Sequence, residues 1–187
     1  MEIPDLPEMH QELESDYGLE SQWRGQGSEV SLCRERLIKW CNGKGLDLGC
    51  GPSKISPEVI GIDDSDRSMS PMVRDISNLE CFGDSSFDFV FSSHALEDIQ
   101  DTAGILKEWI RVLKSGGYLV LYCPDKQYYY NIGHPRYNVR HKHDFYWWDI
   151  CRIINEINPK TVLEHYARYG PVYKVGEWSW ELVIKKL

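Results

Sequence analysis

The sequence lacks an apolar run that approaches the roughly 18 residues of a membrane-spanning helix. Its beginning, Met1-Glu2-Ile3-Pro4-Asp5, has neither the basic nor the apolar region of a signal peptide. The six cysteines form no Cys-x-x-Cys pair and are spaced too widely for a disulfide framework or a zinc site. We therefore expect a cytoplasmic protein with reduced thiols, no membrane partner and no bound metal.

Basic residues are also scarce, because 21 Lys and Arg stand against 29 Asp and Glu, for a net charge of -8. This balance disfavours attraction to phosphate backbones, so a nucleic-acid partner is not expected. A length of 187 residues with 42% hydrophobic residues suits one globular domain. We expect residues 1–187 to form that domain, with polar residues 1–27 as an arm or lid, or alternatively as a loosely ordered terminus.

Apolar spacing predicts alternating helices and short strands. A helix from Ser28 to Trp40 is expected from apolar residues at intervals of three and four. The proline-rich connection 52–57 is too short for a full helix. The other expected elements are helices at 101–112 and 146–157, and strands at 45–48, 59–62, 72–74, 87–91, 118–123, 161–167 and 178–185. This alternation predicts a parallel, doubly wound sheet.

A glycine turn follows the first expected strand, in Gly45-Leu46-Asp47-Leu48-Gly49-Cys50-Gly51-Pro52. Glycines at such a strand end let a ligand approach the backbone, although they can also form only a turn. Ligands bind beyond the carboxyl ends of the strands in these sheets. That rule gathers seven residues at one edge: Gly49, Gly51, Asp63, Asp75, Ser92, His94 and Pro124.

The turn favours a cofactor without phosphate. A dinucleotide site needs a third glycine and a helix N-terminus that donates amides to the pyrophosphate. Here Pro52 has no amide hydrogen, and Lys54 stands at the position of the third glycine. S-adenosylmethionine needs only close backbone for its amino-acid tail and a carboxylate for its ribose, so it fits better, with a dinucleotide enzyme as an alternative.

Five segments occur in a characteristic order: Leu46-Asp47-Leu48-Gly49-Cys50-Gly51-Pro52, Ile62-Asp63, Ser86-Phe87-Asp88-Phe89-Val90, Ala95-Leu96-Glu97-Asp98 and Val112-Leu113-Lys114-Ser115-Gly116-Gly117. Together they resemble class I S-adenosylmethionine-dependent methyltransferases of the type 11 family, over residues 45–124. The resemblance implies an α/β, Rossmann-like, seven-stranded and mostly parallel sheet with helices on both faces and an antiparallel C-terminal hairpin. The chain departs from the family in its short 51–59 connection and in Asp98, which replaces a common histidine.

The resemblance also implies cofactor contacts. Asp63 would accept hydrogen bonds from both ribose hydroxyls, Asp75 one from the adenine amine, and Asp47 would orient the cofactor's amino group. The full set of expected contacts to S-adenosyl-L-methionine, or to its product S-adenosyl-L-homocysteine, is Asp47, Gly49, Cys50, Gly51, Asp63, Asp64, Asp75, Ile76, Ser92 and Ser93.

Methyl transfer from a sulfonium is an in-line displacement, so positioning the acceptor can supply much of the rate. A general base is needed only where the acceptor must lose a proton. His94 is the candidate because it follows the strand end nearest the expected methyl group. The alternative is a histidine that caps the turn or packs against the cofactor.

The segment after the fifth strand is expected to contact the acceptor. Its basic and aromatic residues suit an anionic group or a ring, and the alternatives are a solvated loop and core packing. The expected acceptor residues are Tyr128, Arg140, His141, His143 and Tyr146. We therefore expect a methyltransferase for a small-molecule or sugar-like acceptor, with a protein or nucleic-acid methyltransferase, or a non-catalytic S-adenosylmethionine-binding module, as alternatives.

Overall fold

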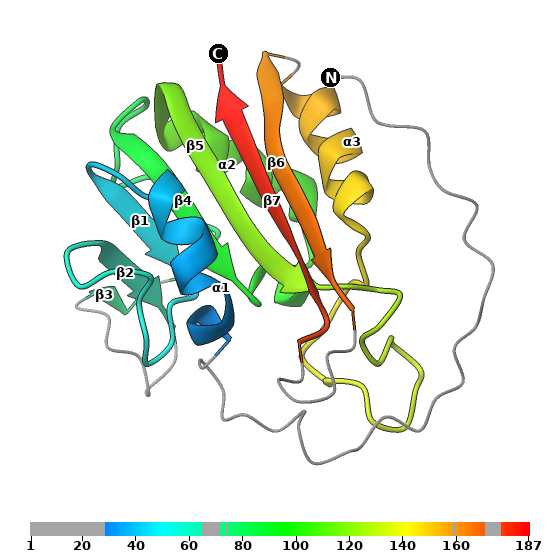
Figure 1. Cartoon of the computed structure of the whole chain (residues 1–187). Helices are drawn as coiled ribbons and strands as arrows, with labels where there is room; N and C mark the ends of the chain where they lie inside the picture. Colours follow the sequence, from blue (N-terminus) through cyan, green and yellow to red (C-terminus); the bar gives the residue numbers. More distant parts are fainter. Residues whose placement is uncertain (1–28, 65–71, 74, 159, 171–176) are drawn as a thin grey trace.

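The computed structural model of the chain describes residues 29–64, 72–73, 75–158, 160–170 and 177–187. Seven strands form one sheet in the order β3-β2-β1-β4-β5-β7-β6 (Figure 1). Their bounds are β1 Gly45–Leu48, β2 Ile60–Asp63, β3 Met72–Val73, β4 Phe87–Ser93, β5 Leu113–Pro124, β6 Thr161–Tyr169 and β7 Ser179–Lys186. Strand β7 pairs antiparallel with both β5 and β6, whereas the pairs among β1 to β5 are parallel. The expected fold class is confirmed.

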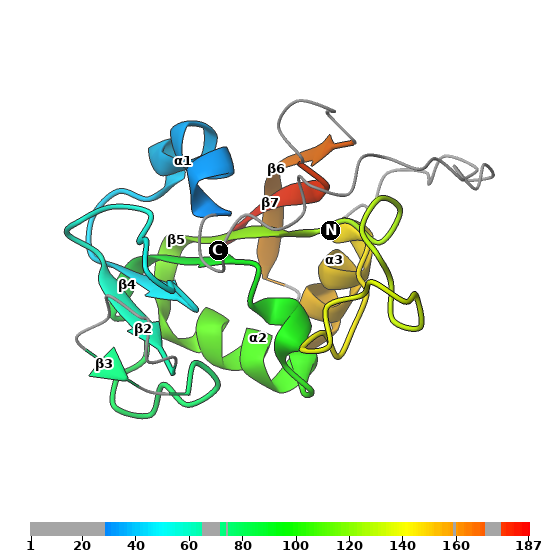
Figure 2. The ribbon, with the colours of Figure 1, turned by 90° about the horizontal axis from the view of Figure 1, so that it is seen from below.

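Helices lie on both faces of the sheet. One face carries α1 (Val30–Leu37), continued by the short η1 (Ile38–Trp40), and the other carries α2 (Thr102–Val112) and α3 (Trp147–Ile157) (Figure 2). Two apolar cores result, a large one beneath α2 and α3 and a smaller one beneath α1. Within the described ranges, no helix has the length and apolar character to cross a membrane.

The connection from β1 to β2 contains turns in place of a helix, as its prolines predicted. Side chains satisfy its backbone instead. Arg34 of α1 donates to the carbonyl oxygens of Ile55 and Lys54 at 3.2 and 2.8 Å. Lys54 Nζ donates to the carbonyls of Pro57 and Val59 at 2.7 and 2.8 Å. These bonds hold the short loop in place beside the glycine turn, without a covering helix.

Buried charges connect α1 to the C-terminal hairpin. Arg36 contacts Glu181 and Glu177 through two side-chain nitrogens, each at 2.5 Å, and its guanidinium lies 3.9 Å from the ring centre of Tyr169. Because both acids are paired with Arg36, the fold can bury them, with Glu181 at 0% and Glu177 at 6% exposure. The network fixes α1, whose preceding residue Glu29 lines the pocket described below.

Three expectations on the elements need correction or stay open. Strand β5 begins at Leu113 and not at Tyr118, because residues 114–117, which lie between the expected helix and the expected strand, form a bulge within the strand, with Gly116 at φ +81°. Strand β3 is Met72–Val73, and Arg74 lies outside the described residues. The expected arm at 1–27 also lies outside them.

Substitution Gly45→Ala should destabilise the fold, because an added Cβ would lie 2.1 Å from Cζ of the buried Phe89 ring. Overpacking of this kind typically costs about 1–3 kcal/mol. Urea unfolding should show a lower midpoint. The matched control is Gly83→Ala, whose Cβ would meet nothing closer than Ser86 Oγ at 3.4 Å. Equal midpoints for the two variants would contradict the packing account.

Candidate functional site

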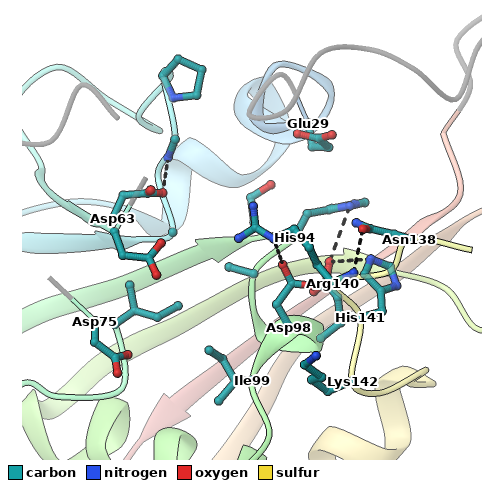
Figure 3. Close-up of a pocket in the computed structure, with 18 of the residues that line it drawn as sticks. Glu29, Asp63, Asp75, His94, Asp98, Ile99, Asn138, Arg140, His141 and Lys142 are labelled. Atoms are coloured by element: carbon teal, nitrogen blue, oxygen red, sulfur yellow. Dashed lines mark hydrogen bonds and ion pairs between the residues drawn. The ribbon is translucent and has the colours of Figure 1, made fainter. Parts of the chain in front are cut away.

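A pocket of about 400 Å³ opens at the carboxyl ends of β1, β2 and β4. Figure 3 shows Asp63 and Asp75 at one end and Asn138, Arg140, His141 and Lys142 at the other. One half is lined by Gly49, Gly51, Pro52, Asp63, Asp64, Asp75 and Ile76. The other half is lined by Glu29, Ser93, His94, Ala95, Glu97, Asp98, Ile99, Tyr129, Asn138, Arg140, His141 and Lys142.

The glycine turn adopts backbone angles that favour glycine. Gly49 and Gly51 have φ values of +73° and +50°, and a Cβ on Gly49 would lie 2.4 Å from that of Ala95. The Gly51 amide donates to Asp63 Oδ2 at 2.7 Å. One hydrogen bond therefore holds the acid at the end of β2 against the turn after β1.

Asp75 and Ile76 are held by neighbouring elements. Asp75 Oδ1 accepts from the Ser77 amide at 2.8 Å, which closes a local turn. The Ile76 carbonyl accepts from Trp109 Nε1 of α2 at 3.1 Å. Both residues line the pocket, and Figure 3 shows Asp75 on the same side of it as Asp63.

Three expected cofactor residues lie outside the main pocket. Asp47 is buried, and its Oδ2 accepts from the Ile55 amide at 2.6 Å. Cys50 and Asp47 line a separate cavity of about 10 Å³. Glu29, Gly49 and Ser93 line both this cavity and the main pocket. Ser92 is buried in the sheet, where its Oγ donates to the Leu48 carbonyl at 2.9 Å. Asp47 and Ser92 therefore support the backbone around the turn.

His94 lies on the floor of the pocket with φ +49°. Its Nε2 is 2.9 Å from Ser179 Oγ, and its ring packs against Tyr122 and Tyr129. Burial lowers the pKa of His94 to about 3, so the imidazole stays neutral near pH 7. These features favour a packing role for His94 over the expected general base.

Glu97 and Asp98 also line the pocket, although the sequence indicated them only as part of a motif. Glu97 Oε1 lies 3.9 Å from His94 Nδ1 and 3.7 Å from His141 Nε2. Glu97 Oε2 is buried with no hydrogen-bond partner among the described residues. Burial raises the pKa of Glu97 well above its usual range. Asp98 is paired with Arg140 at 3.1 Å, and burial raises its pKa as well.

The loop after β5 forms the far wall. The Glu97 carbonyl accepts from the amides of Lys142 and His143 at 2.8 and 3.2 Å, which fixes the loop to η2 (Leu96–Asp98). Tyr129 stacks on His141 with ring centres 5.3 Å apart. The loop thereby adds one aromatic pair and several polar groups to the pocket.

Only two of the five expected acceptor residues, Arg140 and His141, line the pocket. Tyr128 packs beneath Arg168, His143 lies 3.0 Å from the Gln100 carbonyl, and Tyr146 caps α3. The residues that sequence reasoning missed are Tyr129, Asn138 and Lys142. Their signal was their proximity to the expected ones, but spacing within an irregular loop does not indicate which side chains turn inward.

The pocket is acidic. Six carboxyl residues line it, Glu29, Asp63, Asp64, Asp75, Glu97 and Asp98, against two basic residues, Arg140 and Lys142. Such a lining favours a cationic ligand and repels a pyrophosphate. Among the described residues, no group of three or more His, Cys, Asp or Glu side chains could hold a metal ion.

Comparisons with known proteins agree with this geometry. Residues 46–121 match the family model described as a methyltransferase domain. Similar solved structures include an S-adenosylmethionine-dependent methyltransferase from Archaeoglobus fulgidus, with 19% identity, TM-score 0.67, and coverage of 89% of this chain and 97% of that chain.

Another similar structure, also described as an S-adenosylmethionine-dependent methyltransferase, is from Mesorhizobium loti (18% identity, TM-score 0.63, coverage 87% and 100%). A third, from Thermotoga maritima, is described as a possible histamine N-methyltransferase (17% identity, TM-score 0.60, coverage 88% and 92%). No curated protein matches the chain. At these identities the structures establish a shared fold.

Asp47 should make stability depend on pH. Burial raises its pKa to about 7, above the value of about 3.8 in the unfolded chain, so the native state binds more protons between these values. Stability contributed by Asp47 is therefore present below pH 4 and is lost as pH rises through 7. The expected loss is about 2–4 kcal/mol, at about 1.4 kcal/mol per pKa unit.

Urea unfolding at pH 5 and pH 8 tests this dependence. The Asp47→Asn variant keeps an oxygen that can accept from the Ile55 amide, but it carries no ionisable group. Its loss of stability between the two pH values should be smaller than that of the wild type. Identical losses would show that Asp47 does not titrate in this range.

Proposed function

We propose that this chain is an S-adenosylmethionine-dependent methyltransferase and that it methylates a small-molecule or sugar-like acceptor. Residues 46–121, which match the methyltransferase domain, support the first part of this proposal. The observation that carries the proposal is the acidic pocket that joins the glycine turn and Asp63 to a wall of Tyr129 and His141. Its volume of about 400 Å³ lies within the range of small-ligand sites.

The residues of the pocket fit the cofactor. S-adenosylmethionine carries a sulfonium and an ammonium, which suit a carboxylate-rich lining, and it has no phosphate that would need the amide missing at Pro52. Gly49 and Gly51 would contact the methionine portion, Asp63 the ribose, and Asp75 with Ile76 the adenine. When bound, the cofactor supplies an activated methyl group. A dinucleotide would place its pyrophosphate among carboxylates.

The half of the pocket that contains Tyr129, Asn138, Arg140, His141 and Lys142, here called the acceptor half, suits a neutral, hydroxyl-bearing molecule. Tyr129 and His141 offer stacked ring faces, and Asn138 and Lys142 bring polar groups to the same wall. The charge of Arg140 is offset by Asp98 at 3.1 Å, which weakens the case for an anionic acceptor. With six lining carboxyls, the pocket is also unsuited to the backbone of a nucleic acid.

We propose further that the protein acts in the cytoplasm. No disulfide joins any of the six cysteines, all of which lie in the described part of the chain. Cys33, Cys41, Cys50, Cys123 and Cys151 are buried, which is typical of structural thiols in a reducing compartment.

Asp63→Ala should weaken binding of S-adenosylmethionine at least roughly tenfold, because each hydrogen bond to a charged group contributes about 1.5–3 kcal/mol. Titration calorimetry measures this effect. Glu58→Ala is the matched control, since Glu58 is an exposed acid of the same β1–β2 connection and does not line the pocket. Undiminished affinity in Asp63→Ala, or tight binding of a nicotinamide dinucleotide in its place, would contradict the assignment.

Turnover should appear as release of S-adenosylhomocysteine when candidate acceptors are supplied. We expect activity among sugars and other hydroxylated small molecules and none with protein or RNA. Tight cofactor binding without release across all four classes would favour the non-catalytic module.

A further inference from the structure

Glu97 occupies an unusual place in the pocket. It lies on η2 directly after β4, is 2% exposed, and lines the acceptor half. Its Oε1 lies between the imidazoles of His94 and His141, and its Oε2 is buried without a hydrogen-bond partner among the described residues. An unsatisfied buried carboxyl oxygen destabilises a fold, so it calls for a role that the fold alone does not give.

The backbone of Glu97, and not its side chain, makes the hydrogen bonds that hold the neighbouring loop. Its carbonyl accepts the two amides, from Lys142 and His143, that fasten the loop after β5. Any side chain would leave those two bonds in place. A well-packed apolar residue would also avoid the desolvation of the carboxyl group. The backbone bonds therefore give no reason for a carboxyl group at this position.

Other possible proton acceptors in this half of the pocket are less suited. His94 is engaged with Ser179, and burial lowers its pKa to about 3. Burial likewise lowers the pKa of His141. Asp98 also has one buried oxygen, Oδ1, without a hydrogen-bond partner among the described residues, but its Oδ2 is paired with the cationic Arg140. Tyr129 has a pKa raised to about 12 by burial, so it retains its own proton.

We infer that Glu97 is the residue that takes the proton from the acceptor hydroxyl during methyl transfer, with the imidazoles of His94 and His141 beside its carboxylate. The inference rests on the proposed function. The acceptor O–H bond breaks and its proton passes to the Glu97 carboxylate, while the acceptor oxygen forms a bond to the methyl carbon. The carbon–sulfur bond breaks, and its electron pair stays on sulfur.

The step leaves no unbalanced charge in the buried site. Before transfer, the positive sulfonium of bound S-adenosylmethionine would be balanced by the Glu97 carboxylate. After transfer, both the thioether and the protonated Glu97 are neutral. Burial disfavours an isolated carboxylate at this position, so Glu97 should be protonated without the sulfonium and ionised with it. The surroundings that set this balance are Glu29, His94, Asp98, Cys123, Tyr129, Arg140 and His141.

Binding of the two cofactor forms tests the inference without an acceptor. The wild type should release up to about one proton more on binding S-adenosylmethionine than on binding S-adenosylhomocysteine, because only the former carries the sulfonium. Titration calorimetry in buffers of different ionisation enthalpy measures this difference. Both molecules carry the same amino-acid group, so its titration cancels.

The variants are Glu97→Gln and Asp98→Asn. The difference in proton release should vanish in Glu97→Gln and persist in Asp98→Asn, which removes the neighbouring carboxylate. Persistence in Glu97→Gln would overturn the inference. Thermal unfolding should show Glu97→Gln to be at least as stable as the wild type, since it removes a buried ionisable group. Failure of the wild type to bind S-adenosylmethionine would instead overturn the proposed function.

Discussion

Parallel pairing of β1 with both β2 and β4 is the constraint on which the site depends. It brings three strand ends to one edge, so that residues far apart in the sequence meet around one pocket. The bond from the Gly51 amide to Asp63 Oδ2 joins two of those ends. Because the turn between them has no helix, Arg34 and Lys54 supply the hydrogen bonds that keep this edge in place.

Burial of acids governs the electrostatics of the pocket. Asp47 and Glu97 are both nearly inaccessible to water, and burial raises the pKa of each. Burial therefore favours the neutral form of Glu97, which lines the pocket, and of Asp47, which lies outside it. The same physical effect disfavours His94 as a base, because burial also favours the neutral form of an imidazole.

The loop after β5 depends on η2 for its position. Two backbone amides of the loop donate to the carbonyl of Glu97, and Arg140 forms an ion pair with Asp98 of the same short helix. The cofactor half and the acceptor half of the pocket are therefore connected through the residues that directly follow β4. Changes in this short helix would alter both the wall of the pocket and its charge.

The sequence by itself determined the alternation of strands and helices, the glycine turn and the acid after β2, because apolar spacing and glycine positions are local features, while the family resemblance implied the antiparallel hairpin. It also indicated that the 51–59 connection has no room for a full helix. Only the tertiary structure decided which side chains enter the pocket: Tyr129 and not Tyr128, Lys142 and not His143, Glu97 as well as His94. The physical reason is that side-chain direction in an irregular loop, and the burial that shifts a pKa, arise from contacts between distant segments.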